Sequence, residues 1–273
     1  MSTAASTSDS DPDDDGEPSE ATRGRPAPPC EFDPERILFH GDGLVAIDKP
    51  AGIPVHCGTD HDVGVAELVE QWISLNPGVI ESRPGKKVHP VHRLDLEASG
   101  ALVLALKRTV ARRAQDAFSA RTVEKRYLAV IAGPVDREGV LEGEVRSRLR
   151  GQYRRLPARV RYRRLRHDER MSLVEVVPEG GRTHQIRAVL AQSGRPLAGD
   201  LRYGKPKPAR QFLERFGVAG LILHAHRLVL PATVIGRRLV LEATLPEALA
   251  SVCEQKGWAG LARDPRGEWI AAG

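Results

Sequence analysis

The chain has 273 residues, of which 41% are hydrophobic, enough to bury the core of one or two domains. No stretch of about 18 consecutive apolar residues occurs, so the sequence predicts no membrane-spanning helix. It also begins without the basic and apolar regions of a secretory signal. Three cysteines, Cys30, Cys57 and Cys253, lack a C-x-x-C spacing. We therefore expect a cytoplasmic protein with free thiols rather than a disulfide framework or a zinc site.

The net charge of +5 is unevenly distributed along the chain. Residues 1–31 contain eight acidic and two basic side chains, a balance of −6, so residues 32–273 carry +11. The acidic segment is rich in Ser, Asp, Pro and Gly and is predicted to be a disordered tail, because it cannot bury enough surface to offset its ordering entropy. This tail either aids solubility or competes with a polyanion for the basic remainder. Residues 32–273 are predicted to form one domain that binds a polyanion.

The first half of this domain alternates short apolar runs with helical patterns. Apolar runs at 37–39 and 44–47 flank a Gly-Asp-Gly turn and predict a β-hairpin. Further along, the patterns predict a helix at 65–75, a buried strand at 101–106, a helix capped by Thr109 and a strand at 127–132.

The second half begins with a strongly basic stretch. Residues 146–170 contain eleven arginines and only two acids, and the part around Val160–Arg164 is predicted to be extended. The later patterns predict strands at 171–177, 222–223, 228–230 and 239–243, and helices at 183–192 and 246–255. Because strands and helices do not alternate strictly, the expected fold class is α+β, with a mixed, largely antiparallel sheet flanked by helices.

Two polar clusters are candidates for the functional site. The first is the segment Val91–Gly100, which contains His92-Arg93-Leu94-Asp95. It directly precedes the predicted buried strand, and that strand would hold the segment rigid. The segment Gly180–Arg187 leads from two glycines into a predicted helix, with Thr183 as its N-cap and Arg182 suited to bind an anion. We expect Arg187 to point outward from that helix. Taken singly, each cluster is also compatible with an ordinary structural turn or a capped helix.

Taken together and in order, these segments resemble the RluA-type family of pseudouridine synthases. The resemblance covers roughly residues 37–245 and rests on several elements. They are Lys49-Pro-Ala-Gly52, His92-Arg-Leu-Asp95 with Ser99-Gly100, Lys125-Arg-Tyr127-Leu-Ala129, Gly181-Arg-Thr-His-Gln-Ile-Arg187, Gly199-Asp200 with Tyr203-Gly204, and Leu223-His-Ala225. Ala98 departs from the family pattern, which usually has Thr at this position.

The resemblance implies an isomerase that converts uridine within structured RNA to pseudouridine in a central RNA-binding cleft, without a cofactor. It implies that Asp95, Tyr127 and Arg187 are catalytic. It further implies substrate binding by His92, Arg93, Arg182 and Leu223, although His92 and His184 are also suited to structural hydrogen bonds. We expect a monomer whose partner is large-subunit ribosomal RNA or transfer RNA, with neither DNA nor a membrane involved.

Three alternatives stand beside this interpretation. A non-catalytic RNA-binding or ribosome-assembly protein could share the fold. A hydrolase could use Asp95 and Glu97 as paired carboxylates. His224 and His226 share one face of a predicted strand, but no third ligand of suitable spacing follows, so no metal site is expected.

Overall fold

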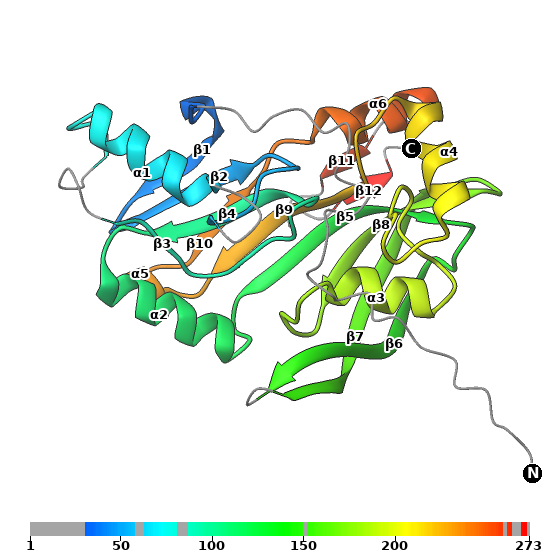
Figure 1. The fold of residues 1–273 in the computed structure, drawn as a ribbon, viewed down its shortest axis with the longest axis horizontal. Helices are drawn as coiled ribbons and strands as arrows, with labels where there is room; N and C mark the ends of the chain where they lie inside the picture. The colour runs from blue at the N-terminus through cyan, green and yellow to red at the C-terminus, as the bar shows by residue number, and fades with distance from the viewer. Residues whose placement is uncertain are drawn as a thin grey trace, which may run out of the picture.

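The computed structural model describes residues 31–57, 63–80, 87–149, 152–258, 261–263 and 269–271. The predicted tail at 1–31 lies outside these residues except for Glu31, and so does Cys30. The described part forms a single domain built on a large open sheet, with helices packed against it (Figure 1). None of the described helices is both long and apolar enough to cross a membrane.

Ten strands form the main sheet, in the order β1-β2-β4-β9-β5-β8-β7-β6, with β3 paired to β4 and β10 paired to β9. Their bounds are β1 Ile37–Gly41, β2 Leu44–Lys49, β3 His89–Pro90, β4 Ser99–Ala105, β5 Glu124–Ala132, β6 Glu138–Leu149, β7 Gln152–His167, β8 Met171–Pro178, β9 Leu223–Leu230 and β10 Leu239–Glu242. A separate two-stranded sheet pairs β11 Leu261–Arg263 with β12 Trp269–Ala271. Among the pairings of the main sheet only β4 with β9 is parallel, which confirms the expected mixed, largely antiparallel sheet.

Six α-helices surround the sheet in the described residues: α1 Val65–Leu75, α2 Arg108–Ser119, α3 Gln185–Gln192, α4 Pro206–Phe216, α5 Ala232–Ile235 and α6 Glu247–Gln255. A short 3₁₀ turn, η2 Pro34–Arg36, precedes β1. The apolar faces of α1 and α3 pack against alternate residues of β2, β4, β5 and β8 in one core cluster. The intervening residues of these strands face α2, α4, α5 and α6 in two further clusters, so the sheet is covered on both faces.

Most predicted elements are confirmed, and the deviations have local causes. The two predicted strands at 222–223 and 228–230 are a single strand, β9, because the polar residues between them are themselves buried. The patterns did not reveal α4, α5, β3, β6, β11 or β12. Thr109 was wrongly predicted as a helix cap: α2 begins at Arg108, after Lys107 in extended backbone, without a side-chain cap.

Gly100 allows the parallel pairing that places β4 beside β9 in the centre of the sheet. Its φ of +111° is unfavourable for other residues, and a Cβ there would lie 2.4 Å from the carbonyl oxygen of Ala225. The register pairs Ser99 with His224 and Gly100 with Ala225, so β4 and β9 approach closely at their beginnings. The loop before β4 is thereby fixed beside the start of β9.

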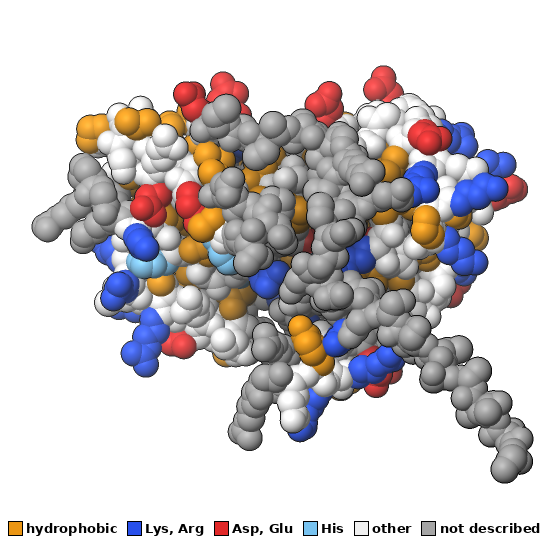
Figure 2. All heavy atoms as spheres, viewed as in Figure 1, with side chains coloured by type: hydrophobic (Ala, Val, Ile, Leu, Met, Phe, Trp, Pro, Cys, Tyr) orange, Lys and Arg blue, Asp and Glu red, His pale blue; other side chains and the backbone are white. Residues whose placement is uncertain are grey.

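β6 and β7 form a long hairpin that projects from the sheet as an arm (Figure 1). The pairing of β7 with β8 ends at Val160 opposite Pro178, whereas the pairing of β7 with β6 continues to Gln152 opposite Leu149. The outer part of the hairpin is therefore a two-stranded ribbon. In Figure 2 lysine and arginine side chains are prominent on this projection.

Candidate active site

A cavity of about 760 Å³ lies where the loop before β4, the start of β5 and the segment from β8 to α3 meet. Six of the seven predicted site residues line it, and the list is His92, Arg93, Asp95, Tyr127, Arg182 and Leu223. The seventh, Arg187, lies behind Asp95 in the first turn of α3. A cavity of this volume can hold a nucleotide with its base. The two polar clusters found in the sequence thus meet at one place.

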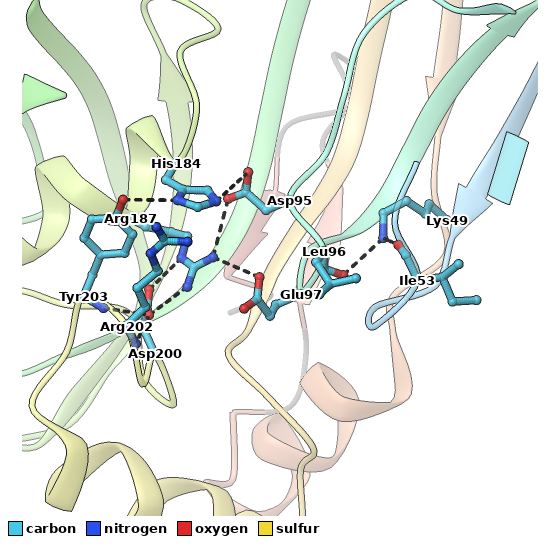
Figure 3. Close-up of polar contacts among 10 residues, drawn as sticks. All are labelled: Lys49, Ile53, Asp95, Leu96, Glu97, His184, Arg187, Asp200, Arg202 and Tyr203. Carbon is cyan, nitrogen blue, oxygen red and sulfur yellow. Dashed lines mark hydrogen bonds and ion pairs between the residues drawn. The ribbon is translucent and has the colours of Figure 1, made fainter. Parts of the chain in front are cut away.

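Asp95 lies in a tight turn just before β4, in which the N–H of Ala98 donates to its carbonyl oxygen at 3.1 Å. Its side chain is 15% exposed and faces two nitrogen groups (Figure 3). Arg187 Nη1 lies 3.9 Å from Oδ2, and His184 Nε2 lies 3.9 Å from Oδ1. Both distances exceed hydrogen-bond length, so the carboxylate is near cationic and polar groups without being locked to either.

Arg187 is buried, which corrects the expectation that it points outward from its helix. Its Nε and Nη2 donate to both oxygens of Asp200 at 2.8 and 2.9 Å, and Nη1 donates to Glu97 at 2.9 Å. Burial alone would lower the pKa of Arg187, but the hydrogen bond to Asp200 and the charges of Glu97, Asp200 and Asp95 raise it above its ordinary value. The guanidinium is therefore a permanent positive charge beside Asp95.

Tyr127 lies near the start of β5 and packs against the same core cluster as α1 and α3. Burial, with the charge of Asp95 as a second cause, raises the pKa of the Tyr127 phenol above its ordinary value. The phenol is consequently neutral at physiological pH, with its ring available at the cavity wall.

His184 is a site residue whose position could not be anticipated. It precedes α3 in left-handed backbone, with φ of 51°, which turns its ring toward Asp95. Its Nδ1 lies 3.1 Å from the hydroxyl of Tyr203, whose ring packs edge-on against it. Burial is the largest cause that lowers the pKa of His184, so the imidazole is neutral at physiological pH. In the sequence, the one feature that pointed to His184 was its place in the Gly181–Arg187 motif.

Thr183 is not the N-cap of α3, so that prediction was wrong. Thr183 is exposed, and the side chain of Gln185 accepts from the backbone N–H of Arg182 at 3.1 Å instead. The same Gln185 side chain donates to the carbonyl of Arg159 at 3.0 Å, which ties the start of the helix to β7. One buried nitrogen of Arg182, Nη1, has no hydrogen-bond partner among the described residues. This cavity-lining cation is therefore suited to an incoming anion.

Lys49 fixes the loop that contains Asp95, a role that the sequence did not reveal. It is fully buried, and its ammonium donates to the carbonyls of Ile53, Pro50 and Leu96 at 2.6, 2.8 and 3.3 Å (Figure 3). Leu96 directly follows Asp95, so the ammonium links the Lys-Pro-Ala-Gly turn to the loop. Burial lowers the pKa of Lys49 to about 7, although the charges of Asp95 and Glu97 oppose this shift.

The remaining predicted residues differ in how free they are to bind a substrate. His92 accepts from the N–H of Val103 at 3.0 Å and stacks on Phe118, so one ring nitrogen is committed to the fold. Burial, followed by the charge of Lys125, lowers the pKa of His92 to about 3. Arg93 is exposed at the cavity wall, whereas Leu223 is buried there. Substrate binding by these residues stays a prediction.

The two histidines considered as metal ligands have separate partners. His224 Nδ1 lies 2.9 Å from Ser99 Oγ, and His226 Nε2 lies 3.0 Å from Glu175 Oε1. Within the described ranges no group of three His, Cys, Asp or Glu side chains has a geometry that could hold a metal ion.

Comparison with known proteins assigns this fold and site to a class. Residues 43–192 match the family model described as RNA pseudouridylate synthase, and the chain belongs to that family. It is an isomerase that converts uridine in RNA to pseudouridine. The matched segment includes both polar clusters of the site, so the hydrolase with paired Asp95 and Glu97 is no longer favoured. Glu97 is instead an ion-pair partner of Arg187.

Particular relatives extend over most of the chain. The tRNA pseudouridine synthase C of Salmonella typhi is 34% identical over 259 residues, which cover 86% of this chain and 95% of the relative. The ribosomal large subunit pseudouridine synthase D of Nitrosomonas europaea is 33% identical over 236 residues, which cover 82% and 66% respectively. Among solved structures, human RNA Pseudouridylate Synthase Domain Containing 4 superposes with a TM-score of 0.66 at 26% identity, covering 81% of this chain and 92% of the other.

Proposed function

We propose that Asp95 drives isomerisation of a uridine in transfer RNA or large-subunit ribosomal RNA. The observation that carries this proposal is the convergence of Asp95 and Tyr127 on one cavity, with the permanent charge of Arg187 behind Asp95. The proposal that the chain is a non-catalytic RNA-binding or ribosome-assembly protein explains none of this convergence.

The reaction breaks the bond between uracil N1 and ribose C1′, turns the base within the cavity, and joins C5 to C1′. The C5 proton then leaves and N1 takes up a proton, so no atom is gained or lost overall. Asp95 acts as an ionised carboxylate, either by attacking C1′ or by abstracting a proton of the sugar. Both roles gain from the 3.9 Å spacing of the Asp95 carboxylate from Arg187 and His184, because a tightly paired carboxylate is a weaker nucleophile and base.

Tyr127 is proposed to stack on the uracil ring while the base is detached. Because its pKa is raised, the phenol can donate a hydrogen bond, but it has to give up its own proton before it can take the proton from C5. The target uridine reaches the cavity by flipping out of its stack, at a cost of a few kcal/mol. Arg93 and Arg182 are proposed to hold the displaced nucleotide through its phosphates.

Transfer RNA is the first substrate to test, because the relative named for tRNA is matched over 95% of its length and the relative named for ribosomal RNA over 66%. We further propose that the protein works in the cytoplasm as a monomer, and that residues 1–31 form a tail separate from the catalytic domain at 32–273. The charge contrast between these two segments supports that division.

The test is release of tritium from RNA whose uridines carry tritium at C5. Unmodified transfer RNA and large-subunit ribosomal RNA are incubated with the wild type and with Asp95→Ala. The expected result is release by the wild type, and loss of release with retained RNA binding in Asp95→Ala. Equal release by both proteins would refute the role of Asp95, and binding without release by the wild type would favour the non-catalytic alternative.

A further inference from the structure

The arm formed by β6 and β7 begins at the rim of the catalytic cavity. The carbonyl of Arg159 in β7 accepts from the N–H of Glu179 and from the side chain of Gln185, both at 3.0 Å. Gln185 lines the cavity, so the root of the arm is bonded directly to the cavity wall. From Arg159 outward, β7 continues for six residues to Tyr153, which at the rise of an extended strand is about 20 Å.

The arginines of the arm fall into two groups with different surroundings. In the inner group three arginines pair with acids: Arg159 with Glu142 at 3.2 Å, Arg161 with Glu179 at 3.2 Å, and Arg163 with Glu175 at 3.1 Å. These charges are already compensated within the protein. These three arginines are therefore less available to phosphates.

The outer group lies in a segment of different composition. Residues 145–158 include five arginines and no acidic side chain. Arg146 lies directly opposite Arg155 in the register, and Arg154 and Arg155 are exposed. Like charges directly opposite one another repel, and a bound polyanion would reduce this repulsion.

An exposed aromatic side chain lies within this outer group. Tyr153 is 51% exposed, one of the few large hydrophobic side chains left at the surface of the described residues. The guanidinium carbon of Arg146 lies 3.9 Å from the centre of its ring, a cation–π contact that holds the ring in place. A fixed, exposed ring between arginines is the arrangement by which proteins bind unpaired nucleotides, since the base stacks on the ring and the phosphates meet the cations.

We propose that the outer end of the arm binds an unpaired nucleotide of the substrate RNA, away from the target uridine. The base stacks on Tyr153, and the neighbouring phosphates pair with Arg154 and Arg155. This inference rests on the proposed function, because it identifies how the same RNA is held at a second point. It adds affinity and positions the RNA, and it leaves the chemical step at Asp95 unchanged.

The test compares Tyr153→Ala with Tyr153→Phe, which keeps the ring and removes only the hydroxyl. With unmodified transfer RNA as substrate, Tyr153→Ala is expected to raise KM about 5- to 100-fold at nearly unchanged kcat, and Tyr153→Phe to stay within about twofold of the wild type. Direct binding of a fluorescein-labelled single-stranded oligouridylate is measured by anisotropy in parallel. This second readout needs no turnover, so a failure of the proposed function is distinguishable from a failure of the arm.

The phosphate contacts are tested by salt dependence. The double variant Arg154→Ala/Arg155→Ala is expected to reduce the slope of log K against log salt by about 1.4, since each single-strand phosphate contact contributes about 0.7. The matched control is Arg210→Ala/Arg215→Ala, which removes two exposed arginines from α4, at the opposite side of the molecule (Figure 1). Unchanged thermal midpoints verify that all variants fold.

Three results would overturn the proposal. Oligouridylate affinity unchanged in Tyr153→Ala would show that the ring carries no base. An equal loss in Tyr153→Phe would replace stacking by a hydroxyl contact. An equal loss of affinity in the α4 control would show that the arginines act only through the overall charge of the protein. The outer arginines would then have a different role, which is to keep the free edges of the ribbon from pairing with another chain.

Discussion

Removal of the carboxylate of Asp200 is expected to destabilise the protein and displace Arg187. Asp200 is fully buried, and it accepts two hydrogen bonds from Arg187 and one each from the N–H groups of Arg202 and Tyr203. Removing one partner of a buried ion pair costs about 3–5 kcal/mol. Arg187 would stay buried with Glu97 as its remaining hydrogen-bonded carboxylate. For a domain of this size, about 2–4 °C per kcal/mol translates this cost into a fall of Tm of about 6–20 °C.

The measurement is the free energy of unfolding of Asp200→Ala by urea denaturation, with tritium release as the readout of activity. The control is Arg237→Ala, which breaks an ion pair of nearly the same length, 2.9 Å to Asp42, between side chains that are 55% and 47% exposed. Exposed pairs contribute about 0.2–1 kcal/mol, so the control should lose little. Equal losses in the two variants would refute the argument that burial makes the Asp200 pair essential.

Three further predictions concern the support of the site. Gly100→Ala is expected to lower the free energy of unfolding by more than about 3 kcal/mol in urea denaturation, because its Cβ would collide with Ala225 at a positive φ; a loss below about 1 kcal/mol would contradict this. Burial alone would raise the pKa of Glu175, but the hydrogen bond from His226 and the nearby arginines lower it below its ordinary value of 4.5. The stability that ionised Glu175 contributes to the fold is therefore present above pH 4.5 and is lost as the pH falls through the folded-state pKa. Glu175→Gln should therefore lose less stability than the wild type on acidification below about pH 4.5, and parallel curves would contradict the linkage. Burial lowers the pKa of Lys49 from 10.5 to about 7. Between these pH values Lys49 is protonated in the unfolded chain but not in the folded protein, so stability rises with pH. The free energy of unfolding of the wild type, relative to Lys49→Met, should therefore rise by up to a few kcal/mol from pH 7 to 10.5.

Local patterns were sufficient for most of the secondary structure. The helix at 65–75 was predicted with the bounds that α1 has, because its apolar residues recur at helical spacing and Asn76-Pro-Gly ends it. β6 was missed because its polar and apolar residues give no clear period, and its pairing with β7 alone makes it a strand. α4 was missed because Pro206 and Pro208 obscure a helix whose first turn tolerates them.

The order of motifs pointed to Asp95 as the proposed catalytic residue, but it did not show the surroundings of Asp95. The sequence places Asp95 and Arg187 92 positions apart, and nothing in either segment shows that Arg187 is buried against Asp200. Glu97 was considered a second catalytic carboxylate because of its spacing from Asp95, yet it binds Arg187. Which of several nearby charges pair is determined by side-chain directions after folding.

The sequence by itself determined the family and most of the strands and helices, and it pointed to Asp95 as the proposed catalytic carboxylate, because these depend on short-range periodicity and on ordered motifs. Only the tertiary structure decided the burial of Arg187 and Lys49 and the left-handed turn of His184 toward Asp95. It also decided that three inner arginines of β7 pair with acids, whereas Arg154 and Arg155 are exposed. The reason is that burial and charge pairing depend on contacts between residues far apart in the chain. A linear pattern shows which groups are present, and the sheet determines which of them meet.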